Sequence, residues 1–260
     1  MGELEFLGTG TSTGIPLIGC QCKVCLSDNP KNVRLRASVK VDVGGKVIII
    51  DTGPEFRIQA LRAGLSRVDG VLITHTHADH IAGFDDLRAF NFITGEPIRV
   101  WGSRQSCDII RKNFSYIFGD APQVGGGLPQ IELNLAEETF TISGVKVEPI
   151  PVWHGKVPVT GYRIGNMAYV TDVSFIPEQS LAKLEGLELL VLGALRHRRH
   201  STHFNLDEAL EIVRRLKPRK TYLTHISHDL EHERISARLC ELRVEDIEVD
   251  LAYDGLKLTF

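Results

Sequence analysis

The chain has 260 residues, of which 43% are hydrophobic and 24% are charged, and its formal net charge is −3. These proportions are those of an ordinary globular protein and argue against disorder. The small net charge gives no electrostatic footprint of a dedicated nucleic-acid binder, although it leaves room for a local basic patch. The start, Met1 to Phe6, lacks the basic region and apolar core of a signal peptide, and no run approaches about 18 apolar residues. We therefore expect a cytoplasmic protein without membrane contact.

Strand-like and helix-like patterns alternate along the whole chain. The predicted strands are Leu4–Leu7, Ser38–Val43, Lys46–Ile50, Val71–Thr74, Ile98–Trp101, Phe140–Ile142, Val145–Ile150, Gly161–Ile164, Ala168–Thr171, Leu189–Leu192, Thr221–Thr224, Glu248–Leu251 and Lys257–Phe260. The predicted helices are Phe56–Ala63, Phe84–Asn91, Ser103–Phe114, Glu178–Leu184, the segment from Asn205 to Pro218, and Glu231–Leu242. Asn205 and Glu208 fit a variant of the capping box.

The length allows one large domain or two small ones. The stretch Gly119–Gln130 is rich in proline and glycine, and we predict a surface loop there and not a domain linker. The mixture of elements indicates an α/β protein with a two-layered core of mixed sheets and helices outside. We expect a single domain over residues 1–260.

His75-Thr76-His77-Ala78-Asp79-His80 places three imidazoles and a carboxylate within six residues, directly after an apolar run. If that run is a buried strand, the cluster lies on the loop at its carboxyl end, where open α/β architectures build their sites. Imidazole nitrogen and carboxylate oxygen are the usual ligands of zinc, manganese and iron. The alternative is a polar loop that happens to be rich in histidine.

Three more metal-competent side chains follow predicted strands: His154, Asp172 and His225. Singly, each would more often be an ordinary loop residue. Four strands that deliver such side chains at the same end would converge on one site, however, and together with the histidine cluster they predict a metal centre.

These residues resemble those of the metallo-β-lactamase superfamily, and the similarity runs from end to end. The segments Gly8 to Pro16 and Ile49 to Gly53 also look like that family. The resemblance implies an αββα sandwich with a dinuclear metal centre at its edge. Carried over, it implies that one metal is held by His75, His77 and His154, that the second is held by Asp79, His80 and His225, and that Asp172 bridges them. Asp51 would orient a ligand, or would be a turn residue at a strand end.

Two cations about 3.5–4 Å apart can share a water and lower its pKa from about 15.7 toward about 7, which supplies hydroxide at neutral pH. Zinc and manganese both suit this donor set, so the ligands do not choose between them. Hydrolysis by attack of the metal-bound hydroxide is the expected chemistry, with Asp79 close to the reacting atoms.

Cys20, Cys22 and Cys25 lie within six residues of one another. In an intracellular protein this loop, at about residues 19–26, reads as a structural zinc site that lacks its fourth ligand. His228, three residues beyond His225, is the candidate. A redox role is the weaker alternative, because the Cys22–Cys25 pair lacks the usual strand–helix context.

The cysteine loop refines the resemblance. Within the superfamily the chain is similar to the phosphodiesterases of the carbon–phosphorus lyase pathway, which hydrolyse phosphoribosyl 1,2-cyclic phosphate and prefer manganese. A relative in pyrroloquinoline quinone biosynthesis shares the cysteines but has lost the histidine cluster, which is intact here. The ribonuclease Z branch is also similar around the metal site, but it normally carries a long arm for tRNA, and no such insertion is evident.

The segment from Arg196 to His203 is densely basic. His203 lies where the cyclic-phosphate phosphodiesterases place a histidine that faces substrate, and we predict that it is a general acid or a phosphate contact. His200 would assist or support it. Arg198 and Arg199 are either solvated or substrate contacts, and the same alternatives apply to Arg34 and Arg36.

The leading prediction is a dinuclear hydrolase of a small cyclic phosphodiester, with two catalytic divalent metals (manganese or zinc) and one structural zinc. Its partner would be a small phosphorylated substrate; nucleic acid is not favoured, and a homodimer is left open. The alternatives are hydrolysis of an RNA 3′-end phosphodiester or a thioester, or a zinc-stabilised carrier without turnover.

Overall fold

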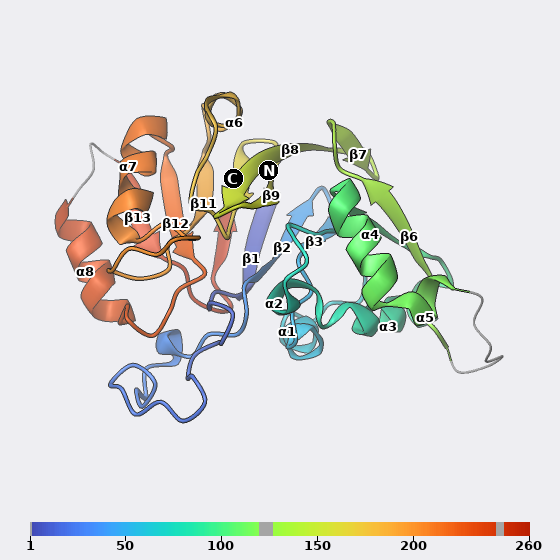
Figure 1. Cartoon of the computed structure of the whole chain (residues 1–260), viewed down its shortest axis with the longest axis horizontal. Coiled ribbons are helices and arrows are strands. Elements are labelled where there is room, and N and C mark those ends of the chain that lie inside the picture. Colours follow the sequence, from blue (N-terminus) through green and yellow to red (C-terminus); the bar gives the residue numbers. More distant parts are fainter. Residues whose placement is uncertain (1, 120–126, 243–246) are drawn as a thin grey trace.

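The computed structural model describes residues 2–119, 127–242 and 247–260, and two seven-stranded sheets pack face to face in it (Figure 1). The first sheet has the order β14 (Lys257–Thr259), β1 (Gly2–Gly8), β2 (Ser38–Val43), β3 (Lys46–Ile50), β4 (Gly70–Leu72), β5 (Ile98–Gly102) and β6 (Ile131–Leu135). From β14 to β3 neighbouring strands are antiparallel, and from β3 to β6 they are parallel.

The second sheet has the order β13 (Glu248–Leu251), β12 (Lys220–Thr224), β11 (Leu189–Gly193), β10 (Met167–Val170), β9 (Val157–Ile164), β8 (Val145–His154) and β7 (Phe140–Ile142). Strands β10 to β13 are parallel, whereas β7 to β10 form antiparallel pairs. Both β10 and β11 are buried along their whole length, which explains why they read as continuous apolar runs.

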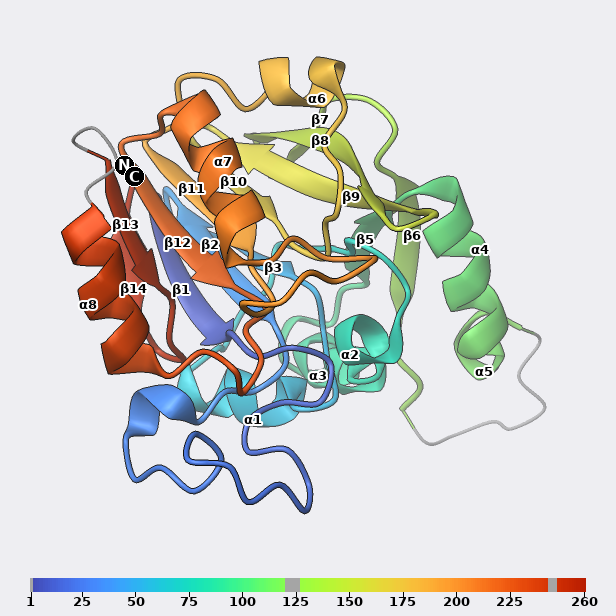
Figure 2. The same cartoon turned by 60° about the vertical axis from the view of Figure 1, so that its left-hand side comes forward.

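Helices cover the outer face of each sheet (Figures 1 and 2). On the first sheet they are α1 (Phe56–Arg62), α2 (Ala78–Ile81), α3 (Arg88–Thr94), α4 (Arg104–Asn113) and α5 (Ser115–Phe118), and on the second they are α6 (Glu178–Ala182), α7 (Leu206–Leu216) and α8 (His232–Leu242). One apolar core lies between the sheets and another lies under each helical layer. The predicted αββα sandwich is therefore confirmed.

The predicted start of α7 is confirmed by its hydrogen bonds. The side chain of Asn205 accepts from the Glu208 N–H at 2.8 Å, and the Glu208 carboxylate accepts from the Asn205 N–H at 3.0 Å. These two bonds satisfy donors that the first helical turn leaves open. No helix in the described parts of the chain is long and apolar enough to cross a membrane.

Several predicted boundaries were wrong. Strand β4 ends at Leu72, β8 continues to His154, and the helix predicted at Phe84–Asn91 is a 3₁₀ turn, Phe84–Leu87, followed by α3. Strand β6 and the short helices α2 and α5 were not predicted. Of the predicted loop Gly119–Gln130, residues 120–126 lie outside the described part of the chain.

Candidate metal centre

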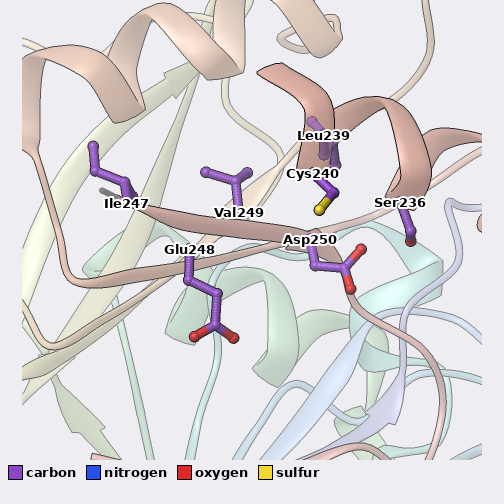
Figure 3. A pocket seen from close by; sticks show the side chains of 7 residues that line it. All are labelled: Ser236, Leu239, Cys240, Ile247, Glu248, Val249 and Asp250. Atoms are coloured by element: carbon purple, nitrogen blue, oxygen red, sulfur yellow. The ribbon is translucent and has the colours of Figure 1, made fainter. Parts of the chain in front are cut away.

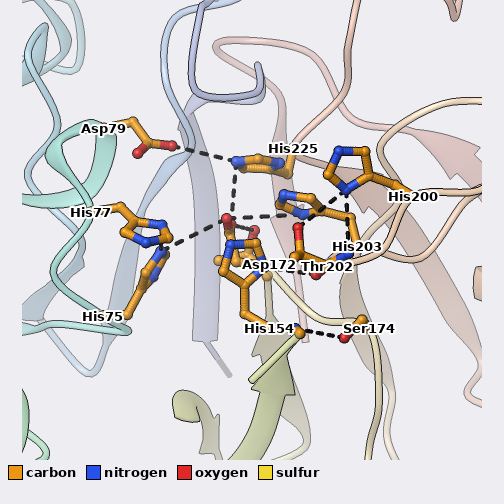
Figure 4. A network of polar contacts seen from close by, with 12 residues as sticks. His75, His77, Asp79, His154, Asp172, Ser174, His200, Thr202, His203 and His225 are labelled. Carbon is orange, nitrogen blue, oxygen red and sulfur yellow. Dashed lines mark hydrogen bonds and ion pairs between the residues drawn. The ribbon is translucent and has the colours of Figure 1, made fainter. Parts of the chain in front are cut away.

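The seven predicted metal ligands gather at one edge of the sandwich, where the ends of strands from both sheets meet, and Figure 4 labels all of them except His80. Donor atoms of the first group, His75, His77 and His154, lie within 4.8 Å of one another, and the same holds for the second group, Asp79, His80, Asp172 and His225. They come from the loop after β4, from α2, from the end of β8, and from the turns after β10 and β12. Except for the exposed His77, they are buried or nearly so.

Three strand-end residues of the site have left-handed backbones. The φ angles are 65° at Asp51, 50° at Asp172 and 56° at His225. This conformation costs about 1–2 kcal/mol for a residue with a Cβ, and it persists only where the surroundings hold it. Asp51 and His225 directly follow the last residue of their strands, and Asp172 is the second residue after β10, so each strained turn directs its side chain toward the shared edge.

Helix α2 is held in place by the turn after β3. Thr52 N–H donates to the His80 carbonyl at 2.8 Å, and Gly83 N–H donates to the Thr52 carbonyl at 2.9 Å. A Cβ on Gly53 would lie 2.3 Å from the Asp79 carbonyl oxygen. Only glycine therefore allows this turn to approach the backbone that carries Asp79 and His80.

The carboxylate of Asp51 orients His80. One Asp51 oxygen accepts from His80 Nδ1 at 2.7 Å and from Thr74 Oγ1 at 2.8 Å, and the other accepts from the Thr74 N–H at 2.8 Å. Since an ionised carboxylate only accepts, Nδ1 of His80 carries the proton and its Nε2 lone pair faces the cluster.

The same argument applies to two other histidines. His154 Nδ1 donates to the Thr202 carbonyl at 2.7 Å, and His75 Nδ1 lies 3.1 Å from Thr74 Oγ1, whose own proton goes to Asp51. In both rings Nε2 is the nitrogen left to face a cation, and His75 Nε2 lies 2.9 Å from Nδ1 of His77, another donor of the same group. Thr74 and Thr202 were not among the predicted site residues. Thr74 was readable as the strand-end hydroxyl beside the cluster, whereas Thr202 acts through its carbonyl and leaves no side-chain signal.

Several buried polar atoms of the cluster lack a protein partner. Nε2 of His80 and both ring nitrogens of His225 have no hydrogen-bond partner among the described residues. His80 Nε2 lies 3.2 Å from Asp79 and 3.3 Å from Asp172, and His225 Nε2 lies 3.3 Å from Asp172. Such unpaired groups are costly in a buried site unless a ligand completes them. The donor set therefore fits divalent cations.

The charges of the cluster are strongly coupled. Burial opposes ionisation of Asp172, but the neighbouring His225 and His80 outweigh it and hold the pKa of Asp172 well below its usual value. Burial also opposes charge on His80, yet Asp172 and Asp51 outweigh it and raise the pKa of His80 well above its usual value. Burial lowers the pKa of His75 well below its usual value, with a further contribution from His80. The site thus keeps Asp172 ionised, although burial raises the pKa of Asp51, and a cation bound at His80 Nε2 would take the place of the proton there.

His203 lines the same site. Its ring centroid is 4.4 Å from that of His154 and 4.9 Å from that of His225, and Nδ1 lies 4.0 Å from an Asp172 oxygen. Burial, and then the proximity of His225, lower its pKa to about 3. The ring of His200 lies 5.2 Å from that of His203, and its Nδ1 accepts from the Thr202 N–H.

The arginines singled out in the sequence have partners other than the metal donors. Arg34, predicted to meet phosphate or solvent, is fully buried, and both alternatives are wrong for it. Arg36 pairs with Glu55 and donates to the Ser12 carbonyl. The exposed Arg198 and Arg199 form long ion pairs with Asp229, at 3.8 Å, and Glu208, at 3.4 Å, as expected of a solvated loop.

The three cysteines of the predicted zinc loop surround His228. Its Nδ1 lies 3.3 Å from Cys20 Sγ, 3.6 Å from Cys22 Sγ and 3.5 Å from Cys25 Sγ. The Cys25 N–H donates to Cys22 Sγ and lowers the pKa of that thiol to about 7, whereas burial raises the pKa of Cys25 to about 11. Three thiols and one imidazole form a four-donor group that could hold a metal ion, as the predicted structural zinc site requires.

A pocket between α8 and the edge strand β13 is separate from both clusters (Figure 3). Its lining is Ser236, Leu239, Cys240, Ile247, Glu248, Val249 and Asp250. None of these residues belongs to either donor group, so the pocket adds nothing to the metal centre.

Comparison with known proteins places this fold and site in a family. Residues 46–226 match the β-lactamase superfamily domain. A solved diphosphatase of the PhnP family is 43% identical, covers 100% of this chain and 97% of that chain, and gives a TM-score of 0.91. An octanoyltransferase from Porphyromonas gingivalis is 34% identical over 96% of this chain and 50% of its own length. A ribonuclease Z from Anoxybacillus flavithermus is 24% identical over 94% of this chain and 91% of its own length.

Since the superfamily domain matches well over half of the chain, the chain belongs to the β-lactamase superfamily and carries a metal-dependent hydrolase domain. The end-to-end similarity to the diphosphatase places it, more particularly, with the PhnP family. The predicted superfamily is thereby confirmed. The chain spans about half the length, or less, of the first curated relatives that it matches.

Proposed function

We propose that this chain hydrolyses a P–O bond in a small phosphodiester, with a cyclic phosphate as the first candidate, and that it uses two divalent cations. The observation that carries the proposal is the set of buried ring nitrogens without partners that converge with Asp79 and Asp172. Neutral imidazoles and ionised carboxylates are the donors of manganese and zinc.

Asp172 is the proposed bridge between the two cations. Its Oδ1 lies 3.3 Å from Nε2 of both His80 and His225, whereas its Oδ2 lies 3.8 Å from His75 Nε2. Each carboxylate oxygen thus faces one donor group. His75, His77 and His154 would hold the first cation, and Asp79, His80 and His225 the second.

When bound, such a pair of cations supplies a water of lowered pKa and positive charge for phosphoryl oxygens. The residues of this chain supply the rest. Asp51, Thr74 and the Thr202 carbonyl fix the histidine rings by hydrogen bonds to Nδ1, which holds each lone pair in one direction.

His203 is proposed to contact the phosphoryl or the departing oxygen. With its pKa lowered to about 3, the ring is neutral near pH 7 and carries one N–H. Of the two predicted roles, general acid and phosphate contact, this favours the phosphate contact, with the ring as hydrogen-bond donor. His200, which accepts from the Thr202 N–H, supports the loop that carries His203.

The similar proteins support P–O bond hydrolysis of a small substrate. The neighbour at 43% identity is a diphosphatase, which widens the candidates to small diphosphates. RNA is less favoured, because the alignment with the ribonuclease Z runs over 302 positions, more than the 260 residues of this chain, so that enzyme carries insertions that this chain lacks.

A second candidate is hydrolysis of an acyl thioester. The observation that favours it is the 34% identity to an octanoyltransferase, although this chain corresponds to only half of that protein. The metal centre would serve here as well, because two cations stabilise a carbonyl oxygen in the same way as a phosphoryl oxygen.

The test is a hydrolysis panel with metal-free protein to which manganese or zinc is added. The substrates are bis(p-nitrophenyl) phosphate, 2′,3′- and 3′,5′-cyclic nucleotides, ribose 1,2-cyclic phosphate, a small nucleoside diphosphate ester, a lactam and a glutathione thioester. We expect turnover of a phosphoric ester, and we expect it to be lost in a variant that combines His75→Ala with Asp172→Ala. Thioester cleavage without phosphodiesterase or diphosphatase activity would refute the proposal in favour of the second candidate.

A further inference from the structure

His225 differs from the other histidines of the metal centre in what holds its ring. Nδ1 of His75, His80 and His154 each has a protein partner, whereas neither ring nitrogen of His225 has a hydrogen-bond partner in the described residues. The His225 ring stacks on those of His80, at 5.8 Å, and His203, at 4.9 Å. Stacking fixes the plane of the ring but not its position within that plane. Apart from the carboxylates of Asp172 and Asp79, which lie 3.3 and 3.6 Å from Nε2, the position therefore depends on the main chain that carries the ring.

That main chain needs support, because His225 is left-handed. The next residue, Ile226, supplies it through two backbone bonds to the glycine-rich segment after β1. Ile226 N–H donates to the Thr9 carbonyl at 2.9 Å, and the Ile226 carbonyl accepts from the Thr11 N–H at 3.0 Å. The position of His225 thus follows the position of Thr9 to Thr11.

Thr9 is itself anchored by a buried polar cluster. Its Oγ1 donates to Asp254 Oδ1 at 2.7 Å and accepts from Arg34 Nη1 at 2.8 Å. The second Asp254 oxygen accepts from the Leu35 N–H at 2.8 Å, and the Leu35 carbonyl accepts from the Gly10 N–H at 2.8 Å. Thr9 and Arg34 are 0% and 1% exposed. Bonds to charged partners in such a site are about twice as strong as neutral ones.

We propose that Thr9, Arg34 and Asp254 form a positioning cluster that fixes His225 as a ligand of the second cation. The proposal rests on the metal centre of the proposed function. None of the three touches a cation or substrate; they act through the Thr9–Ile226 backbone bond. A single hydroxyl links the two charged side chains, so its loss leaves both without their shared partner and leaves Thr9 held by main-chain bonds alone.

Thr9→Val removes this hydroxyl and keeps the shape of the side chain. The matched control is Thr221→Val, because Thr221 is also 0% exposed, lies on β12, and has a hydroxyl without a partner in the described residues. Metal-free protein is titrated with Mn²⁺, which oxygen and imidazole donors bind and the thiolate loop does not favour. In addition, wild type, Thr9→Val and Thr221→Val are loaded with Co²⁺, and their visible absorption spectra are compared.

We expect Thr9→Val to bind one of its two cations about tenfold or more weakly, as loss of an outer hydrogen bond does at metal sites. Thr221→Val should match the wild type, and Thr9→Ser should restore the affinity. The proposal is overturned if Thr9→Val binds both cations as tightly as Thr221→Val does. This holds even if the melting temperature of Thr9→Val falls, because the cluster would then contribute to stability only.

If Thr9→Val does not fold, Asp254→Asn undergoes the same titration, and wild-type affinity in it overturns the proposal. The proposed function can fail independently. A wild-type protein that binds two cations but cleaves no phosphoric ester refutes the function, while the titration still tests the cluster.

Discussion

The His/Asp cluster and the cysteine cluster are built in opposite ways. Three of the four cysteine-cluster donors come from six consecutive residues, and a single histidine closes the set. The His/Asp cluster takes seven donors from strand ends of both sheets, from His75 to His225. Four donors around one cation leave no place for a substrate, whereas seven donors shared by two cations leave positions open. The difference supports the proposed division of roles, in which the local cluster would stabilise a loop and the distributed cluster would perform the chemistry.

The surroundings of the two clusters differ in the same sense. The cysteines are half-buried on a loop that projects from the sandwich (Figure 2), whereas six of the seven His/Asp donors are buried or nearly so. At the distributed cluster, Asp172 and His225 have left-handed backbones, and the ring nitrogens of His225 lack hydrogen-bond partners among the described residues. Strain of this kind concentrates where function requires a fixed geometry.

The largest expected effect is that of Asp172→Asn, which removes the charge between the two donor groups and keeps the side-chain size. We expect kcat/KM to fall on the order of 10³-fold or more, because the variant loses the charge that both cations share. Metal analysis should show at least one cation fewer per chain, with zinc retained by the cysteines. Activity within threefold of the wild type would break the comparison, because the distributed cluster would then not be the catalytic one.

His203→Gln tests the chemistry of the distributed cluster without touching a proposed ligand. We expect kcat to fall on the order of 10²-fold, since one hydrogen bond to the reacting group is lost, while metal content is unchanged. A histidine whose pKa is about 3 is neutral across the working range. The rate profiles of variant and wild type should therefore be parallel from pH 5 to 8. If the wild-type rate instead fell above about pH 6.5 and the rate of the variant did not, His203 would act as a charged acid.

The sequence predicted most of the fold because its strands are continuous apolar runs. The bounds of β2, β3, β7 and β13 agree with the prediction, whereas β6 was missed because its side chains are only partly buried. Helix α2 has four residues, too few for a helical period, and its sequence was interpreted as part of a loop. Both errors arise where burial is set by neighbours and not by local pattern.

The donors of the candidate site were also predictable from the sequence, whereas some residues around them were not. The seven donors stand in one short motif or directly at strand ends, so their convergence followed from the order of the strands. The position of Arg34 did not follow from the order of the strands. Its buried partners include the Ala252 carbonyl and His232, which lie 218 and 198 residues away in sequence. Packing between such distant segments leaves no local signal, and a basic residue after a loop was interpreted as either a phosphate contact or a surface residue.

Cys22→Ser sharpens the comparison from the other side. We expect the variant to retain its two catalytic cations and kcat/KM within about threefold of the wild type, while it loses zinc and its melting temperature falls. The physical reason is that this site is closed and contributes to folding, not to the reaction. His225 and His228 share one loop, however. A large loss of kcat/KM at full occupancy of the catalytic cations would show that the two clusters are coupled.

The smallest expected effect concerns acid stability at the base of the cysteine loop. His232 is 2% exposed, and burial, followed by the charge of Arg34, lowers its pKa from 6.5 to about 4. Between these values the unfolded chain binds a proton that the folded chain does not, so this stability is present above pH 6.5 and is lost as the pH falls to 4. After allowance for solvent screening, the difference is about 2 kcal/mol. His232→Gln should flatten the dependence by that amount in urea unfolding from pH 4 to 7. An unchanged slope would show that His232 does not contribute to the acid sensitivity.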